Sequence, residues 1–186
     1  PALLLIAHAG APGVADTAAN GAVYNGRARE LDVRVPRIEA GAEIDGRLDE
    51  PVWRDAAILT GFSQFSPADG RPAQDSTEIL VWYSATAIHF GVRAHEAHGV
   101  VNATLADRDR LGAEDPIEIL LGTFDDGRQA YVFGVNPFGV QMDGTINETG
   151  TPRAGGSTDG GLQSREEPDL NPDFVFASKG RLRGAG

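Results

Sequence analysis

Apolar and polar residues alternate along several short segments of this chain, and a period of two is typical of β-strands. Thr77–Tyr83 and Ile88–Ala94 have this pattern on either side of a short connector, so together they predict a β-hairpin. One side of the hairpin is expected to face a core, and it carries Ile79, Val81, Tyr83, Ile88, Phe90 and Val92. The other side then carries Glu78, Leu80, Trp82, His89, Gly91 and Arg93.

A second group of strands follows farther along the chain. Pro116–Phe124 and Gln129–Val135 meet across an Asp-Gly pair, which is a strong hairpin signal. A turn at Asn136–Gly139 leads into Val140–Ile146, so these segments predict a three-stranded meander, and Phe174–Ala177 predicts one more short strand. The residues expected to be buried are Ile79, Val81, Phe90, Val92, Ile119, Leu121, Tyr131 and Phe133.

The stretch EIDGRLDEPVWRDA, from Glu43 to Ala56, contains a short helical signal. Pro51 follows two acids, as at the start of a helix, and apolar residues recur at helical spacing up to Ala57. We expect Trp53 to be buried there as part of a core. The carboxylates expected to make turn or cap hydrogen bonds are those of Asp45, Asp49 and Glu50.

Short strands separated by Gly, Pro and Asp turns predict an all-β protein, an antiparallel two-layer β-sandwich. The domain is expected to span residues 28–186 and to lack its closing strands, because the chain stops soon after a strand. Residues 1–27 are expected to be a signal-peptide remnant and a disordered tail, because an apolar run at Leu3–Ala7 precedes small residues. This pattern predicts an exported protein that is periplasmic, secreted or associated with the outer membrane.

Charge and composition exclude several classes of function. The 16 basic and 27 acidic residues give a net charge of −11, which repels phosphate backbones and anionic lipid headgroups. Binding to nucleic acid and insertion into a membrane are therefore not expected, and the run at Leu3–Ala7 is too short to span a bilayer. The absence of cysteine excludes disulfides, thiolate nucleophiles and Cys-ligated metal sites.

Several motifs, taken in sequence order, carry a resemblance to a known family. They are Ile44–Glu50 with Trp53, the strand Thr77–Tyr83, the pair Arg108-Asp109, and DDGRQAYVFGVNPFGVQMDG from Asp125 to Gly144. Over about residues 38–180 the chain resembles the family 9 carbohydrate-binding-module-like domain, in the version at the amino terminus of exported bacterial proteins with a β-rich carboxyl-terminal region. The resemblance implies a jelly-roll-like sandwich, non-catalytic binding of a polysaccharide or oligosaccharide, and association with glycoside hydrolases or outer-membrane proteins.

The hypothesis of carbohydrate binding places the ligand on the second face of the first hairpin. Trp82 is the candidate stacking ring, because sugars pack their C–H faces on aromatic rings and pair their hydroxyls with polar groups. The candidate polar partners are Glu78, His89, Arg93 and Asn136. The alternative is a structural or interaction domain that docks on the missing β-rich carboxyl-terminal region and binds no sugar. An exposed Trp82 favours the first hypothesis, and a buried Trp82 favours the second.

Metal binding and catalysis have weaker signals. Asp107, Asp109 and Asp115 offer oxygen ligands to calcium, but their spacing is not that of an EF-hand, and a solvated acidic loop is the alternative. His95 and His98 are too closely spaced for the helical zinc motif of metalloproteases. No catalytic motif is present, so no cofactor is expected and this segment is not expected to catalyse a reaction, whereas its parent chain could hydrolyse O-glycosyl compounds.

Overall fold

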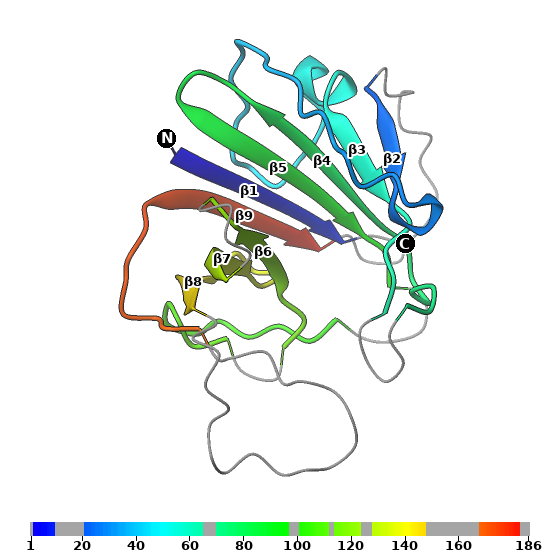
Figure 1. Ribbon diagram of the computed structural model, residues 1–186. Coiled ribbons are helices and arrows are strands. Elements are labelled where there is room, and N and C mark those ends of the chain that lie inside the picture. The colour runs from blue at the N-terminus through cyan, green and yellow to red at the C-terminus, as the bar shows by residue number, and fades with distance from the viewer. Residues whose placement is uncertain are drawn as a thin grey trace.

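The computed structural model describes residues 2–9, 21–64, 70–96, 101–111, 114–123, 128–147 and 168–182, the first of these segments by its backbone. They form two facing β-sheets, so the predicted all-β sandwich is confirmed (Figure 1). The strands are β1 (Ala2–Ala9), β2 (Val23–Asn25), β3 (Ala57–Thr60), β4 (Thr77–Tyr83), β5 (Ala87–Ala94), β6 (Ile117–Leu121), β7 (Gln129–Val135), β8 (Gln141–Asn147) and β9 (Phe176–Leu182). Two short 3-10 helices, η1 (Gly26–Ala28) and η2 (Pro51–Arg54), accompany them. No helix in this part of the chain has the length and apolar character needed to cross a bilayer.

The two sheets differ in size and in pairing. The larger sheet has six strands in the order β2-β3-β4-β5-β1-β9, and the smaller sheet has three in the order β6-β7-β8. The smaller sheet is the predicted meander, and both of its strand pairs are antiparallel. The larger sheet is mixed rather than antiparallel, because β1 runs parallel to β5 and β9, and β2 runs parallel to β3. The jelly-roll connectivity stays a prediction.

The structure places Ala2–Ala9 in the larger sheet, whereas the sequence pattern predicts a disordered tail there. The backbone of this segment pairs with β5 on one side and with β9 on the other. An apolar sequence suits an internal strand, because both faces of such a strand are usually covered. Val23–Asn25 forms an edge strand of the same sheet, which therefore begins before residue 28.

The main core lies between the two sheets. Its buried members are Val81, Phe90, Val92, Ile119, Phe133, Val135 and Phe176. Most of the residues predicted to be buried are among them, whereas Ile79, Leu121 and Tyr131 are only partly buried against the same cluster. Tyr83 is expected on this side but is 40 % exposed, because it is the last residue of β4.

A second core covers the opposite face of the larger sheet. It is formed by residues 38–56, which we call the covering segment, packed over Leu80 and Trp82 of β4. Gly91 leaves room for this layer, because a Cβ added there would lie 3.0 Å from Cζ3 of Trp53 and 2.7 Å from Cδ2 of Leu48. The buried members of this core are Val52, Trp53, Ala56, Ile58, Leu80 and Trp82.

The predicted burial of Trp53 within the covering segment is confirmed. Its indole Nε1 donates a hydrogen bond of 3.0 Å to Oε2 of Glu50, and Oε1 of Glu50 accepts one of 2.9 Å from the Glu43 amide. η2 begins at Pro51, whose missing N–H is not needed in the first turn. The Glu50 carboxylate therefore holds both the Trp53 indole and the backbone at Glu43 in place.

The other two acids of this stretch differ in their contacts. Oδ1 of Asp45 accepts a hydrogen bond of 2.8 Å from the Arg47 amide, which is the expected turn bond. Asp49 instead makes an ion pair with Arg47, with 3.9 Å between the two atoms. Its carboxylate is largely exposed, so an ionic contact replaces the expected hydrogen bond at this position.

Candidate functional site

Trp82 is fully buried under the covering segment, with 0 % of its surface exposed. Its indole stacks on the ring of His89, with 3.6 Å between the ring centroids and 5° between the planes. Trp53 packs against it edge to face, with 6.0 Å between centroids and 76° between planes. Residues of the chain itself therefore occupy the surroundings of this ring, which corrects the expectation of an open stacking ring.

The predicted register of the hairpin formed by β4 and β5 is confirmed. Trp82 lies opposite His89 and Glu78 lies opposite Arg93, so these four candidates share one face of the larger sheet. Glu78 and Arg93 form an ion pair, with 3.5 Å between Oε2 and Nη1, and the Arg93 side chain is mostly buried. The structure thus brings four of the five candidates onto one face, but it buries Trp82 and His89 and leaves the Glu78 side chain 42 % exposed.

His89 is held in an apolar layer. Burial lowers the pKa of its imidazole below the ordinary value of 6.5, so the ring is neutral at pH 7. Neither Nδ1 of His89 nor Nε1 of Trp82 has a hydrogen-bond partner among the described residues. Two unpaired buried nitrogens on stacked rings indicate that packing, rather than polar recognition, determines this arrangement.

Asn136 lies in the turn that follows β7, apart from the other candidates, and the hydrogen-bonding groups of its side-chain amide are fully used. Its Nδ2 donates to the Thr104 carbonyl at 2.8 Å and to Oε2 of Glu114 at 2.7 Å. Its Oδ1 accepts from the amides of Phe138 and Val140 at 3.0 and 2.9 Å, which fixes the turn between β7 and β8. Hydrogen bonds from the Thr104 hydroxyl, and then from the Asn136 amide, lower the pKa of Glu114. Asn136 therefore anchors a turn and has no hydrogen-bonding capacity left for a sugar.

Three carboxylates from separate segments surround the guanidinium of Arg108. Asp109, Asp143 and Asp173 bring oxygen atoms within 4.8 Å of one another. Nη2 of Arg108 donates to Oδ1 of Asp143, and its Nε lies 3.9 Å from Asp109 and 3.7 Å from Asp173. The same guanidinium donates to the Phe174 carbonyl at 2.8 Å. The Arg108 guanidinium is thus the cation that these three acids contact. The cluster joins the segment before β6 to β8 and to the segment before β9.

The three calcium candidates do not meet in one place. Only Asp109 belongs to the cluster around Arg108. Oδ2 of Asp115 accepts a hydrogen bond of 2.8 Å from the Asn102 amide, elsewhere in the connection between β5 and β6. Asp107 uses its carbonyl to accept from the Arg110 amide at 3.3 Å. His98, the second histidine considered for zinc, lies outside the described residues.

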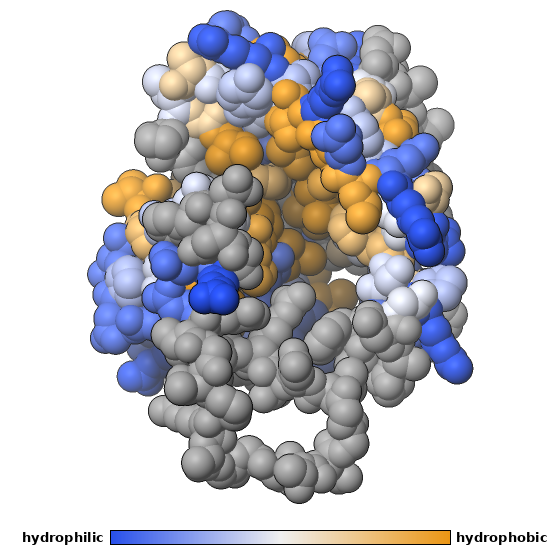
Figure 2. Space-filling model, in the orientation of Figure 1, coloured by the Kyte–Doolittle hydropathy of each residue, from blue (hydrophilic) through white to orange (hydrophobic). Residues whose placement is uncertain are grey.

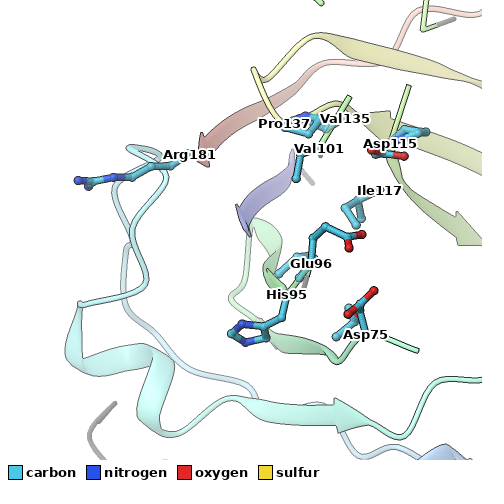
Figure 3. Close-up of a pocket in the computed structure, with 13 residues that line it drawn as sticks. Asp75, His95, Glu96, Val101, Asp115, Ile117, Val135, Pro137 and Arg181 are labelled. Atoms are coloured by element: carbon cyan, nitrogen blue, oxygen red, sulfur yellow. The ribbon is translucent and has the colours of Figure 1, made fainter. Parts of the chain in front are cut away.

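A cavity of about 250 Å³ opens between the two sheets, where β5 and β7 end and β4 and β6 begin (Figure 3). We call it the end pocket. Its apolar lining includes Val92 and Ala94 from the larger sheet and Ile117 and Val135 from the smaller sheet. Val92 and Val135 are fully buried, so the end pocket reaches down to the main core.

Charged residues line the mouth of the end pocket. They are Asp75, Glu96, Asp115 and Arg181, and His95 lines the same pocket. In Figure 3 the carboxylates of Asp75 and Glu96 turn toward the space beside Ile117, whereas the Arg181 side chain extends away from it. The end pocket therefore combines an apolar floor with a mouth in which acids predominate.

Sequence reasoning missed the end pocket, although its acids occupy related positions along the chain. Asp75 precedes β4 and Glu96 follows β5. In an antiparallel hairpin the start of one strand lies beside the end of the other. The predicted hairpin therefore already places these two acids close to each other. Asp115 precedes β6, in the other sheet, and only the packing of the two sheets brings it to the same end.

The comparisons with known proteins do not assign the chain to a family. No protein-family model, no curated protein and no solved structure matches it.

Proposed function

We propose that this chain is a non-catalytic interaction domain, which binds an extended strand of a β-rich protein region along the open edge of β6. The observation that carries the proposal is the difference in strand number between the two facing sheets, because one has three strands and the other has six. Figure 2 shows apolar residues gathered around a hollow near the middle of the visible face. A strand added beside β6 would widen the smaller sheet opposite the larger one and cover more of its apolar face.

β6 is an edge strand, and its outer side has no hydrogen-bonded neighbour in the described part of the chain. Alternate residues of such a strand direct their N–H and C=O groups outward, where an incoming strand can pair with them. The sequence of Ile117–Leu121 is IEILL, so it has neither the proline nor the lysine that commonly protects an edge. Leu120 is 38 % exposed on one face and Ile119 is buried on the other. An open backbone edge therefore coincides with apolar side chains.

The alternation along β6 also defines the chemistry of the partner strand. Ile117, Ile119 and Leu121 pack against the core, so the partner needs apolar residues on the corresponding face. Glu118 points to the other face, where a basic residue opposite it is favourable. The net charge of −11 disfavours a second copy of this chain as the partner. We therefore expect a strand in which apolar residues alternate with Lys or Arg.

The alternative function, non-catalytic binding of an oligosaccharide or polysaccharide, lacks an accessible site among its candidates. Trp82 is covered, the Asn136 amide is used within the protein, and Glu78 is paired with Arg93. The resemblance to the family 9 carbohydrate-binding-module-like domain supports an exported, β-rich parent protein as well as a sugar ligand. We place the interaction function first because it does not require the covering segment to move.

An NMR titration with synthetic strand peptides tests this function. A peptide that alternates Val and Lys is expected to shift the backbone amide signals of Ile117–Leu121, whereas a peptide that alternates Val and Glu is not. Glu118→Lys is expected to weaken binding of the first peptide about two- to tenfold, as charge changes at exposed positions usually do. Glu39→Lys is the matched control, because Glu39 is equally an exposed acid but lies in the covering segment.

Other outcomes of the same measurements contradict the function. Equal responses to the two peptides would contradict the proposed preference for a basic strand. Shifts that map away from β6 would contradict the proposed binding edge. A dimer in light scattering at low concentration would identify a second copy as the occupant of this edge. Specific binding to a glycan array would place carbohydrate binding ahead.

A further inference from the structure

β1 lies between β5 and β9 in the larger sheet, and we call its place the strand slot. It pairs with β5 along its whole length and with β9 from Leu3 to Ala9, and it runs parallel to both strands. Parallel pairing is slightly less stable per residue than antiparallel pairing. Because β5 and β9 run in the same direction, a single strand can also be antiparallel to both. β1 therefore occupies the strand slot in the less favourable of the two orientations.

The two walls of the strand slot are held by contacts that do not involve β1. β5 pairs with β4 on its other edge. β9 is fixed to the smaller sheet, because Nε2 of Gln141 donates to the Phe176 carbonyl at 3.1 Å and to Oγ of Ser178 at 2.9 Å. A Cβ added at Gly180 would lie 2.0 Å from the carbonyl oxygen of Pro137, so the two backbones are in close contact there. Both walls can therefore stay in place when β1 leaves.

The strand slot is covered on both faces. On one face it borders the main core, through Phe90 of β5 and Phe176 of β9. On the other face the covering segment packs over Gly91 of β5, and a Cβ added to Gly46 of this segment would lie 3.0 Å from Cβ of Arg181 in β9. A strand in the slot therefore needs apolar or small residues on both faces, as all but one of the residues in ALLLIAHA are.

The pattern of residues 1–27 predicts a leader that is removed from the mature protein, and β1 belongs to this segment. Its removal would leave the facing edges of β5 and β9 open. We infer that the strand slot is an acceptor site for an apolar strand of a β-rich partner region, which replaces β1 and runs antiparallel to both walls. Backbone hydrogen bonds to two edges at once would supply the affinity, as they do when strands add to other sheets.

The strand slot thus adds a second site to the proposed interaction function, on which it rests only for the β-rich nature of the partner. The edge of β6 belongs to the other sheet and favours a strand that alternates apolar and basic residues. The strand slot instead excludes charged residues, because burying an unpaired charge between two covered faces is costly. The two sites therefore select different strands and can be tested separately.

Hydrogen exchange measured by mass spectrometry on the whole chain tests the role of β1. Leu5→Pro removes a backbone N–H inside this strand and should displace it, because an internal strand does not tolerate proline. We expect the amides of β5 and β9 to exchange at least about tenfold faster, while exchange in β7, between β6 and β8, stays unchanged. Leu5→Val is the matched control, since it keeps the N–H and suits a strand.

A peptide then tests the acceptor. One that alternates Val and Ala over the length of β1, between flanking lysines, should restore slow exchange in β5 and β9 of the Leu5→Pro variant. A peptide that alternates Val and Lys should not. A nitroxide at the carboxyl end of the first peptide should broaden the amide signal of Ala87, at the start of β5, more than that of Ala94, because the peptide enters antiparallel.

Each of several other results would overturn the inference. Unchanged exchange in Leu5→Pro would show that β1 does not fill the slot, and faster exchange in β7 as well would show that the walls depend on β1. Failure of the Val-Ala peptide to restore protection, or broadening mainly at Ala94, would contradict the acceptor or its orientation. A dimer of the parent that Leu5→Pro dissociates would identify β1 of a second copy as the occupant. Failure of the peptides at β6 would leave the strand slot untouched, because the two experiments follow different strands.

Discussion

The two tryptophans occupy the same apolar layer, yet their polar atoms have different surroundings. Nε1 of Trp53 donates to Glu50, whereas Nε1 of Trp82 has no partner among the described residues. A buried donor without a partner costs free energy that the packing of the ring has to offset. Trp53 therefore stabilises the covering segment by packing and by a hydrogen bond, and Trp82 by packing alone.

Replacement of Trp53 tests the role of the covering segment. Trp53→Ala should lower the free energy of unfolding by about 3 to 5 kcal/mol, because it empties an aromatic site in the second core. Urea unfolding followed by circular dichroism measures this change. Trp53→Phe is the matched control; it keeps a ring, loses the bond to Glu50 and should cost less. A Trp53→Ala variant as stable as the parent would contradict the burial of this side chain.

His89 makes stability depend on pH. Its pKa in the folded protein is lowered from 6.5 by burial, so the unfolded state takes up the proton first as the pH falls. Stability is complete above pH 6.5 and decreases as the pH falls from there toward the lowered folded pKa, with a slope of at most about 1.4 kcal/mol per pH unit.

Unfolding in urea at about pH 7.5 and about pH 5.5 measures this dependence. His89→Phe keeps a ring against Trp82 and removes the titrating group, so the variant should lose less stability between the two pH values than the parent loses. An identical loss in both proteins would assign the dependence to other groups.

At the scale of elements, Arg108 links the segment before β6 to β8 and to the segment before β9. It contacts Asp143 of β8 and the Phe174 carbonyl, which lies just before β9. The side chain also lies over the ring of Phe176, 5.7 Å from its centroid. Asp143 is buried, and its carboxylate accepts hydrogen bonds from this guanidinium and from the Phe174 amide. The Arg108 side chain thus links β8 to the segment just before β9.

Arg108→Met should lower the free energy of unfolding by about 2 to 3 kcal/mol, because it leaves the buried carboxylate of Asp143 without its cation. Asp143→Asn made together with Arg108→Met should cost less than the sum of the two single changes, since the pair is then removed as a unit. Chemical denaturation of the four proteins completes this double-mutant cycle. Arg110→Met is the control, and additive effects of the two changes would contradict a direct interaction.

At the scale of the whole molecule, the sequence predicts what is local and misses what depends on distant segments. The period of two places Glu78, Trp82, His89 and Arg93 on one face, and the register confirms it. Alternation does not state what lies over a face, so the sequence left open whether Trp82 is exposed or buried, and the structure decides for burial under the covering segment. The same limit applies to the end pocket, because its walls come from both sheets.

The contact between Arg108 and the Phe174 carbonyl also bears on how the chain acquires its structure during synthesis. These two residues are 66 positions apart, whereas β6, β7 and β8 follow one another as a meander with short connections. Local hairpins close quickly, and contacts between distant segments form later because closing a longer loop costs more entropy. As the chain leaves the ribosome, the smaller sheet can therefore assemble before Phe174 has been made. The contact of Arg108 with Asp143 can then form first, and its contact with the Phe174 carbonyl follows. Phe176 of β9 is the last buried member of the main core along the chain, so this core stays incomplete until β9 has been made.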